Sequence, residues 1–241
     1  MLASLDVSMI RAWKATTVVE RSPTQRLLVL GSSQPESIVS EGARRDRDLL
    51  VVRRRGGGGA VAIDPSSTIW IDVWIPRGSP SFDIDVIRSL ERVGDLTLEA
   101  FRSLGITDLR RAERREVSVG DVACFSAIGH GEILDRSGAK VLGVTAWRCR
   151  EGALFQTASY LRRETAMLVA SLDLDASHRA ALREELDRTT GLLPEALGAH
   201  AQTPELAVQR GLLARSMASV LTGPWGDRAE VARLPEVLAE R

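Results

Sequence analysis

Four consecutive glycines, residues 56–59, are the feature that most restricts how this chain folds. They follow a strand-like run at residues 48–52 and the arginines Arg53, Arg54 and Arg55, and a second strand-like run comes after them. Glycine allows positive φ angles and leaves backbone N–H groups open to a ligand, and arginines supply charge-assisted donors. The segment therefore predicts a loop that binds phosphate or carboxylate, and a flexible solvated loop is the alternative. Its glycine spacing fits neither a P-loop nor a dinucleotide-binding fingerprint.

Short strand-like runs alternate with helical segments over the first two thirds of the chain. Residues 68–75 mix β-branched and aromatic residues, which predicts a strand with its odd-numbered aliphatic residues on one face. Residues 83–104 carry apolar side chains at a period of 3.6 before Gly105, which predicts a helix. Further strands are predicted at residues 27–30, 48–52, 116–119, 123–125 and 153–160, and a hairpin at residues 132–135 and 140–145.

The helical pattern dominates after about residue 163. One amphipathic helix is predicted at residues 176–189, and another runs from its N-cap Thr203 to about Leu221. We therefore predict an α/β (α+β) fold, a mixed β-sheet flanked by helices with a C-terminal helical appendage. The predicted organisation is a catalytic core at residues 1–162 and a helical extension at residues 163–241, packed on or beside the core.

The charge balance excludes several functional classes. The chain has 241 residues, with 32 Lys and Arg against 32 Asp and Glu, so its formal net charge is zero. A nucleic-acid binder or a polybasic membrane-surface protein carries a basic excess, so neither partner is expected. No apolar run approaches the roughly 18 residues of a membrane span, and no signal peptide is recognised. The two cysteines are too few for a disulfide framework, which predicts a cytoplasmic protein with free thiols.

Four segments in order resemble one family, over residues 25–161. The loop at residues 53–61, with Asp64 after it, resembles the R-R-x-S-G-G-G-A-V-x-x-D loop of the lipoate–protein ligase family, with Gly56 in place of the serine. Residues 29–34 resemble its V-x-G-x-x-Q segment, and residues 138–143 its G-x-K-x-x-G hairpin. Cys124-Phe125, followed by residues 131–133, is similar to the C-F…Y-E-L segment of its octanoyltransferase branch. That family shares a catalytic fold with biotin–protein ligases, so the resemblance implies a biotin/lipoate-ligase-like catalytic core.

The resemblance also implies a set of site residues. Lys140, one of only two lysines, occupies the place of the family lysine that binds the acyl carbonyl and the phosphate. Cys124 occupies the place of the thioester-forming nucleophile of the transferases, and a small buried residue is the alternative. Trp70, Trp74 and Trp147 are candidate walls of an acyl tunnel. The implied substrate-binding residues are Arg53, Arg54, Gly57, Gly58, Gly59, Ala60 and Gly143; no metal site is predicted.

The resemblance leaves three alternatives, of which two are acyl-transfer routes and one is a function without catalysis. The first is a lipoate–protein ligase that uses ATP with Mg²⁺ to attach a lipoyl or octanoyl group, through an acyl-adenylate, to a lysine of a lipoyl-domain protein. The second is a cofactor-free octanoyl or lipoyl transferase that uses Cys124 and octanoyl-acyl-carrier protein as donor. The implied acceptors are the glycine cleavage H protein or a 2-oxoacid dehydrogenase E2. The third is a degenerate member that binds an acyl or adenylate ligand without catalysis.

Overall fold

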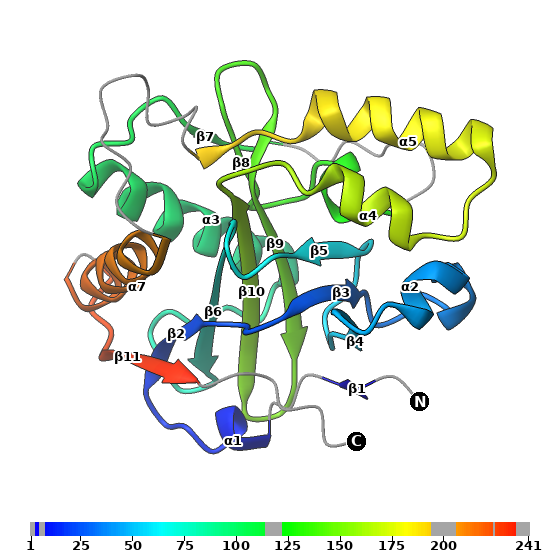
Figure 1. Cartoon of the computed structure of the whole chain (residues 1–241). Helices are drawn as coiled ribbons and strands as arrows, with labels where there is room; N and C mark the ends of the chain where they lie inside the picture. Colours follow the sequence, from blue (N-terminus) through cyan, green and yellow to red (C-terminus); the bar gives the residue numbers. More distant parts are fainter. Residues whose placement is uncertain (1–2, 5–7, 114–121, 194–205, 224, 235–241) are drawn as a thin grey trace.

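Two β-sheets, stacked face to face and covered by helices, make up the fold in the computed structural model of the chain (Figure 1). The structure describes residues 3–4, 8–113, 122–193, 206–223 and 225–234. A mixed sheet flanked by helices is therefore present, as the sequence predicted. No helix among the described residues is long and apolar enough to cross a membrane.

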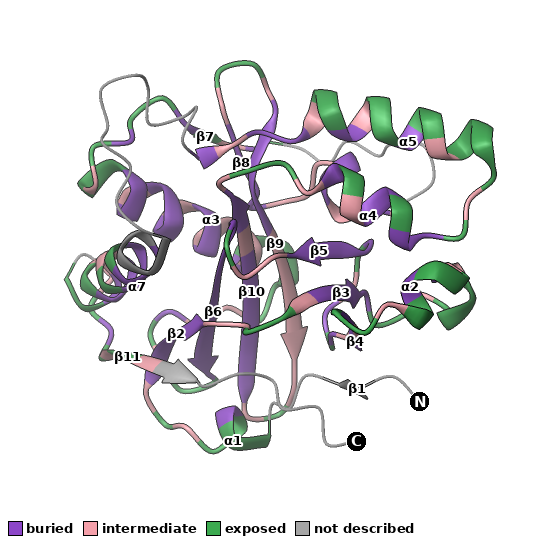
Figure 2. Cartoon of the chain, viewed as in Figure 1, coloured by how far each residue is buried: buried purple, intermediate pink, exposed green. Residues whose placement is uncertain are grey.

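The larger sheet has seven strands in the order β11-β2-β6-β10-β9-β8-β7. Its strands pair antiparallel, except for the parallel pair of β2 with β11. The long central strands are buried along most of their length, and Figure 2 shows this part of the molecule as its most enclosed region. The bounds are β2 Thr16–Arg21, β6 Thr68–Pro76, β7 Arg110–Arg111, β8 Ile133–Leu134, β9 Lys140–Arg148, β10 Gly152–Tyr160 and β11 Ala229–Leu234.

The smaller sheet has the order β1-β4-β3-β5 and carries the glycine loop between two of its strands. Strand β3 pairs parallel with β4 and antiparallel with β5, so the chain reverses direction after the loop. The bounds are β1 Ala3–Ser4, β3 Arg26–Leu30, β4 Leu49–Arg53 and β5 Val61–Ile63. The predicted strands at residues 27–30 and 48–52 are confirmed by β3 and β4.

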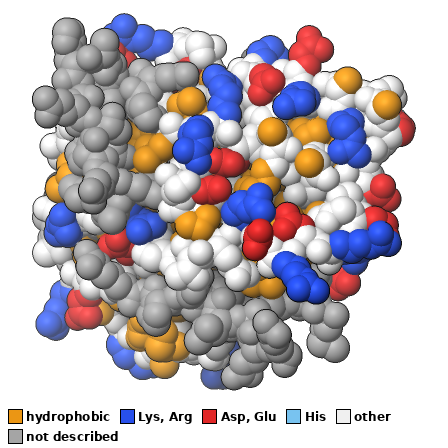
Figure 3. Space-filling view, in the orientation of Figure 1, with side chains coloured by type: hydrophobic (Ala, Val, Ile, Leu, Met, Phe, Trp, Pro, Cys, Tyr) orange, Lys and Arg blue, Asp and Glu red, His pale blue; other side chains and the backbone are white. Residues whose placement is uncertain are grey.

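Helices cover the outer faces of both sheets. Helices α3 (Val86–Ser103) and α7 (Leu206–Thr222) lie against the larger sheet, and together they enclose one hydrophobic core. The smaller sheet, α4 (Thr165–Ser171) and α5 (Ala176–Thr189) enclose a second core that reaches the other face of β6. The remaining short elements are α1 Ser8–Arg11, η1 Glu36–Ile38, α2 Glu41–Arg45 and η2 Cys124–Ser126. On the surface in Figure 3, acidic and basic side chains are interspersed.

Local sequence signals explain several of these elements. Helix α3 begins where the Asp85 carboxylate accepts a hydrogen bond from the Arg88 N–H, and it ends before Gly105, whose φ is +85°. In β6 the side chains of Ile69, Ile71, Val73 and Ile75 lie in the first core, and Trp70 lies in the second. The predicted two-faced strand is confirmed, because each face packs against a different layer.

Other expectations differ from the structure. Residues 123–125 do not extend into the predicted strand: Ala123 makes an isolated bridge to Ala60, and the 3₁₀ turn η2 begins at Cys124. Strand β11 lies in the tail that the pattern predicted as helical, and it pairs with β2 at the edge of the larger sheet. The predicted strand at residues 116–119 and the predicted helix start at Thr203 lie outside the described residues. The division of the chain at residue 162 stays a prediction.

Candidate active site

The side chains of Arg54 and Thr145 fix the glycine loop through its backbone carbonyl groups. Nη2 of Arg54 donates to the carbonyl oxygens of Gly57 and Gly59, each at 2.8 Å, and the Thr145 hydroxyl donates to the Gly57 carbonyl at 3.0 Å. Because the peptide unit is planar and trans, a carbonyl that points at Arg54 directs the next N–H group to the opposite side. The N–H of Gly58 therefore points away from Arg54. Gly58 itself has a φ of +93°, which favours glycine over other residues.

The three arginines before the loop have different surroundings. Arg54 is almost completely buried, and burial lowers the pKa of its guanidinium. Arg53 donates to the carbonyl oxygens of Gly31 and Gln34, so it fixes the turn after β3. Arg55 is exposed and lies over the ring of Trp147, 5.3 Å from its centroid. Arg53 and Arg54 therefore shape the loop through backbone carbonyls, and Arg55 is left at the surface.

Lys140 is buried in an ion pair at the start of β9. Its Nζ lies 2.8 Å from Oε2 of Glu132, donates to the Cys124 carbonyl at 2.5 Å and lies 5.2 Å from the ring centroid of Phe125. Glu132 also accepts the N–H of Gly129 at 2.6 Å. The lysine side chain is 1% exposed and that of Glu132 is 5% exposed. A buried ammonium held in this way is a fixed positive charge inside the molecule.

This ion pair lies at the wall of a cleft that the glycine loop borders. The cleft has a volume of about 460 Å³. Gly57, Gly58 and Gly59 line it together with Val86 and Leu90 of α3. Glycine-loop N–H groups and a lysine ammonium on one cleft make a site suited to an anionic ligand. The further lining residues are Ser33, Gln34, Ala123, Cys124, Ala127, Ile128, Gly129, His130, Glu132, Lys140, Val144, Thr145 and Ala146.

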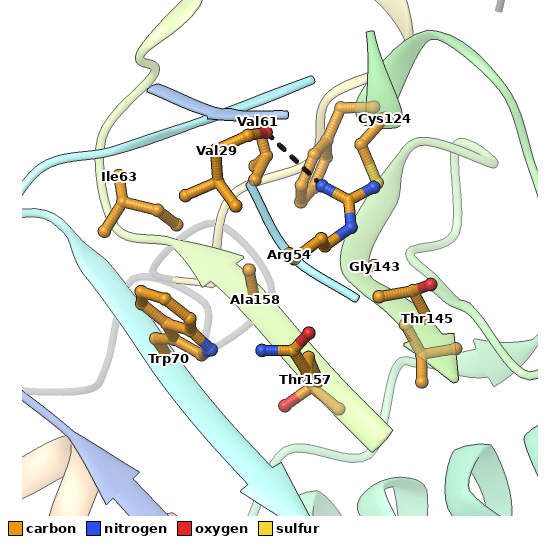
Figure 4. Close-up of a pocket in the computed structure, with 13 residues that line it drawn as sticks. Val29, Arg54, Val61, Ile63, Trp70, Cys124, Gly143, Thr145, Thr157 and Ala158 are labelled. Carbon is orange, nitrogen blue, oxygen red and sulfur yellow. Dashed lines mark hydrogen bonds between the residues drawn. The ribbon is translucent and has the colours of Figure 1, made fainter. Parts of the chain in front are cut away.

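A second, narrower pocket lies between the two sheets and adjoins the cleft. Figure 4 shows Val29, Val61 and Ile63 on one side and Trp70 and Ala158 on the other. Its volume is about 40 Å³, and its lining is mostly apolar. Gly143 and Arg54 line it as well, and the residues shared with the cleft are Cys124, Val144 and Thr145. The two spaces therefore combine a polar entrance with an apolar interior, which suits a ligand with a charged head and an apolar chain.

Cys124 occupies the junction of the two spaces. A Cβ added to Gly143 would lie 3.5 Å from its Sγ, so the glycine leaves room beside the thiol. The backbone N–H of Cys124 donates to the Ala60 carbonyl at 2.8 Å, which joins the turn to the end of the glycine loop. His130 lines the same cleft, and its Nδ1 lies 3.6 Å from Glu91.

A polar cluster lies on the floor of the narrow pocket. Asp72 on β6 is fully buried; its carboxylate accepts Nε of Arg21 and Nε1 of Trp70, both at 2.8 Å. Burial raises the pKa of the Asp72 carboxyl, and the opposing effect of Arg21 is smaller. Gln156 on β10 lies directly opposite Asp72 and lines the pocket. An ionic and amide cluster therefore lies beneath the apolar space.

The structure brings most of the predicted site residues together. Lys140, Cys124 and the three loop glycines share the cleft, and Arg54 and Gly143 line the inner pocket. Arg53 and Ala60 line neither space, and the Ala60 N–H already donates to the Val122 carbonyl. Of the candidate tunnel tryptophans, Trp70 lines the pocket. Trp74 is buried in a separate small cluster, and Trp147 lies at its edge. The described residues contain no group of three or more His, Cys, Asp or Glu that could hold a metal ion.

Sequence reasoning missed Glu132, Thr145 and Gln156 as members of this site. A usable signal exists for Glu132, because the predicted hairpin brings residues 132–135 beside residues 140–145. The ion pair of Glu132 with Lys140 shows that the two side chains lie on the same side of this hairpin. Gln156 has no comparable signal, since its importance depends on Asp72 and Arg21, which come from two other strands.

Solved structures with the same fold belong to lipoate-protein ligases. A bi-partite lipoate protein ligase from Thermoplasma acidophilum matches with a TM-score of 0.70 and 17% identity, covering 99% of this chain and 87% of that one. A T. acidophilum protein assigned as a lipoate protein ligase, solved with bound lipoic acid, matches with a TM-score of 0.66 and 18% identity, covering 98% and 83%. Lipoate-protein ligase A bound with ATP matches with a TM-score of 0.60 and 17% identity, covering 88% and 74%. No curated protein matches the sequence significantly.

These likenesses identify the fold as that of the lipoate-protein ligase class. The sequence itself matches the family model of the lipoyl protein ligase A/B catalytic domain over residues 15–207. The chain therefore belongs to the lipoyl protein ligase A/B catalytic domain family.

Proposed function

We propose that the protein is an ATP-dependent ligase that attaches a lipoyl or octanoyl group to a lysine of a lipoyl-domain protein. The observation that carries this proposal is the position of Lys140. Its buried ammonium lies at the wall of a cleft bordered by the glycine loop, and that cleft adjoins an apolar pocket. Family membership supports lipoylation as the reaction. Structural neighbours solved with lipoic acid and with ATP support the two small substrates.

The proposed arrangement places the acyl chain between the sheets and its carboxyl group at the junction near Cys124 and Thr145. In the first reaction a carboxylate oxygen attacks the α-phosphorus of ATP, and pyrophosphate leaves. In the second the neutral amine of the acceptor lysine attacks the acyl carbonyl carbon, AMP leaves with the electrons of the acyl–phosphate bond, and the proton that the nitrogen loses passes to solvent. Negative charge develops on the carbonyl oxygen in this second step, and the Lys140 ammonium stabilises it. Mg²⁺ is proposed to enter with the phosphates of ATP, which are its usual ligands.

Glu132 has a positioning role in this proposal. Its carboxylate holds the Lys140 Nζ at 2.8 Å and is itself fixed by the Gly129 N–H. The tail of the chain contributes as well, because the Gly191 N–H donates to the Lys140 carbonyl at 2.9 Å and the Thr189 hydroxyl donates to the Phe125 carbonyl at 2.8 Å. The acceptor is proposed to be a lipoyl domain, and the T. acidophilum ligase was studied together with its E2 lipoyl domain.

A second candidate is a transferase that uses Cys124 as nucleophile, with octanoyl-acyl-carrier protein as donor and no cofactor. The position of Cys124 at the junction of cleft and pocket favours it, because an acyl carbonyl bound there lies beside the thiol. Intact-mass measurement separates the two routes. The ligase route predicts pyrophosphate release and a lipoylated acceptor with lipoate, ATP and Mg²⁺, and Cys124→Ser retains this activity.

The transferase route predicts instead a hydroxylamine-sensitive octanoyl adduct after incubation with octanoyl-acyl-carrier protein, lost in Cys124→Ser. A folded protein that binds lipoate or its adenylate but gives neither a lipoylated acceptor nor an octanoyl adduct contradicts both routes. That result supports a family member that binds its ligand without catalysis.

A further inference from the structure

Thr145 joins the glycine loop to the larger sheet, and the proposed acyl transfer gives no task to its hydroxyl group. The residue lies on β9, and its side chain borders both the cleft and the narrow pocket (Figure 4). Its hydroxyl donates to the Gly57 carbonyl at 3.0 Å, and Nη2 of Arg54 donates to the same oxygen at 2.8 Å. A backbone carbonyl oxygen has two lone pairs. The Gly57 carbonyl is therefore occupied from two directions.

These two donors fix the orientation of the peptide unit between Gly57 and Gly58. Arg54 follows β4 of the smaller sheet and Thr145 belongs to the larger sheet, so the two hydrogen bonds come from separate elements. The planar trans peptide directs the Gly58 N–H away from both donors. Gly58 is exposed and lines the cleft, and its N–H makes no hydrogen bond within the part of the chain that the structure describes. This oriented donor is therefore left for a ligand in the cleft.

The loop also packs closely on the Thr145 side chain. A Cβ added to Gly56 would lie 2.6 Å from Oγ1 and 2.9 Å from Cγ2 of Thr145, which is too close for either atom. Glycine at this position is what allows the loop to rest on the threonine. This contact explains why Gly56 stands where the loop pattern of the lipoate–protein ligase family has serine, because Thr145 occupies the space that a side chain at residue 56 would need.

We propose that Thr145 is a positioning residue for the phosphates of ATP, and that it acts by holding the Gly57 carbonyl so that the Gly58 N–H is aimed at a phosphate oxygen. This inference rests on the proposed function, in which ATP occupies the cleft. A backbone N–H that is already oriented binds an anion without the loss of entropy that ordering the loop would require. Without the Thr145 hydroxyl, ATP binding is therefore expected to weaken more than lipoate binding, since the acyl chain lies in the narrow pocket.

Thr145→Val tests the proposal, because it removes the hydroxyl group at nearly constant volume. Calorimetric titration gives the Kd for ATP with Mg²⁺ and, separately, for lipoate, and initial rates of pyrophosphate release give KM and kcat. The variant is expected to raise both the Kd and the KM for ATP about tenfold, with the Kd for lipoate nearly unchanged. Thr145→Ser keeps the hydroxyl group and is expected to recover most of the affinity for ATP.

Thr17→Val is the matched control for this change. Thr17 also lies on a strand of the larger sheet, and its hydroxyl also donates to a backbone carbonyl at 3.0 Å, that of Ala15. It lines neither the cleft nor the narrow pocket, so its affinity for ATP is expected to equal that of the wild type. Gly56→Ala serves as a second variant, because its methyl group displaces the Thr145 side chain, and it is expected to weaken ATP binding as Thr145→Val does.

The outcomes distinguish this inference from the function on which it rests. Wild-type affinity for ATP in Thr145→Val, or a loss that Thr145→Ser does not recover, overturns the positioning role and leaves the proposed function intact. An equal loss of affinity for ATP and lipoate, or the same loss in Thr17→Val, assigns the effect to the general stability of the sheet and also overturns it. A folded wild type that binds lipoate but neither binds ATP nor releases pyrophosphate overturns the proposed ligase and the inference together.

Discussion

Two buried ion pairs lie at the two ends of the candidate site, and they differ in what surrounds them. Lys140 and Glu132 meet at 2.8 Å at the wall of a cleft of about 460 Å³. Arg21 and Asp72 meet at the same distance beneath a pocket of about 40 Å³. The charges and the spacing are alike, but only the first pair borders a space large enough for a substrate head group.

This difference in access decides what each pair contributes. A buried charge that loses its partner is costly, because water cannot solvate it. At the cleft, Lys140 is part of the lining, so an anionic ligand bound there lies beside its charge. Beneath the pocket, the Asp72 carboxylate does not line the space and depends on Arg21 and Trp70. One pair is therefore suited to catalysis, and the other joins the neighbouring strands β2 and β6.

Breaking the ion pair of Arg21 and Asp72 is expected to lower the stability of the protein more than any other change. Asp72→Asn leaves the Arg21 guanidinium buried without its carboxylate, so we expect the free energy of unfolding to fall by about 3–5 kcal/mol. Urea denaturation measures it. Replacing both charges, with Arg21→Met and Asp72→Leu together, is expected to recover much of the loss, because no unpaired charge remains. A double variant as unstable as Asp72→Asn alone would contradict this account.

The second effect is on catalysis at the open pair. Lys140→Met removes the ammonium that stabilises the developing oxyanion, so we expect the rate of acyl transfer to fall by about 10²–10³-fold. Single-turnover transfer to a lipoyl-domain acceptor measures it. The loss of stability is expected to be smaller than for Asp72→Asn, since Glu132 retains the Gly129 N–H and borders the cleft. Equal destabilisation by the two variants would show that the two ion pairs contribute alike to stability.

A third buried cation, Arg54, differs from Lys140 and Arg21 because its hydrogen bonds go to backbone carbonyls. Its geometry depends on Gly58, where an added Cβ would lie 3.1 Å from Nη2 of Arg54 and φ is +93°. We expect Gly58→Ala to cost about 1–2 kcal/mol in the local structure of the loop. Ligand-dependent thermal stability with lipoate and ATP measures the effect on binding.

Gly57→Ala is the matched control for this loop change. Nothing lies within 4 Å of a Cβ added there, and its φ is outside the left-handed range. Without ligand it is expected to unfold at the same temperature as the wild type, because the added methyl group meets no neighbour. If the two variants behave alike, the conformation of Gly58 does not matter to the site.

Most of the fold follows from local patterns in the sequence, and the exceptions have physical reasons. The alternation in β6 and the period of α3 are local, so they predict these elements and their faces directly. Strand β11 escapes prediction because its place depends on pairing with β2, more than two hundred residues earlier in the chain. The turn at Cys124 forms instead of a strand, with Ala60 bridging only to Ala123.

Some residues of the candidate site are likewise predictable from local motifs, and others are not. The glycine loop, Lys140 and Cys124 belong to contiguous motifs, and the structure brings them to one cleft. Arg53 lies in such a motif too, yet its side chain is used by the carbonyls of Gly31 and Gln34. The floor of the pocket is assembled from Arg21, Asp72 and Gln156, each on a different strand. Such a cluster becomes visible only once strand order and register are known.

The exposed ion pair of Arg11 and Glu151 is expected to contribute least to stability. The pKa of Glu151 is lowered to about 2, first by a hydrogen bond from the Cys149 thiol and then by its own backbone N–H and by Arg11. A carboxyl whose pKa is depressed in the folded state adds stability above its unfolded pKa of about 4.3. That contribution is lost as the pH falls through the folded value of about 2. We therefore expect the stability difference between wild type and Glu151→Gln to shrink over this window.

The salt dependence of the unfolding free energy distinguishes the exposed pair of Arg11 and Glu151 from the two buried pairs. The Arg11 side chain is 47% exposed, so added salt screens its contact with Glu151. Arg11→Gln is accordingly expected to change the unfolding free energy only slightly, and less at high ionic strength. Denaturation of both variants at low and high salt, beside Asp72→Asn, measures this. The effect of Asp72→Asn is expected to be nearly independent of salt, because its charges are enclosed. A strong salt dependence for Asp72→Asn would show that water reaches the floor of the pocket, and the contrast between an open and an enclosed pair would then fail.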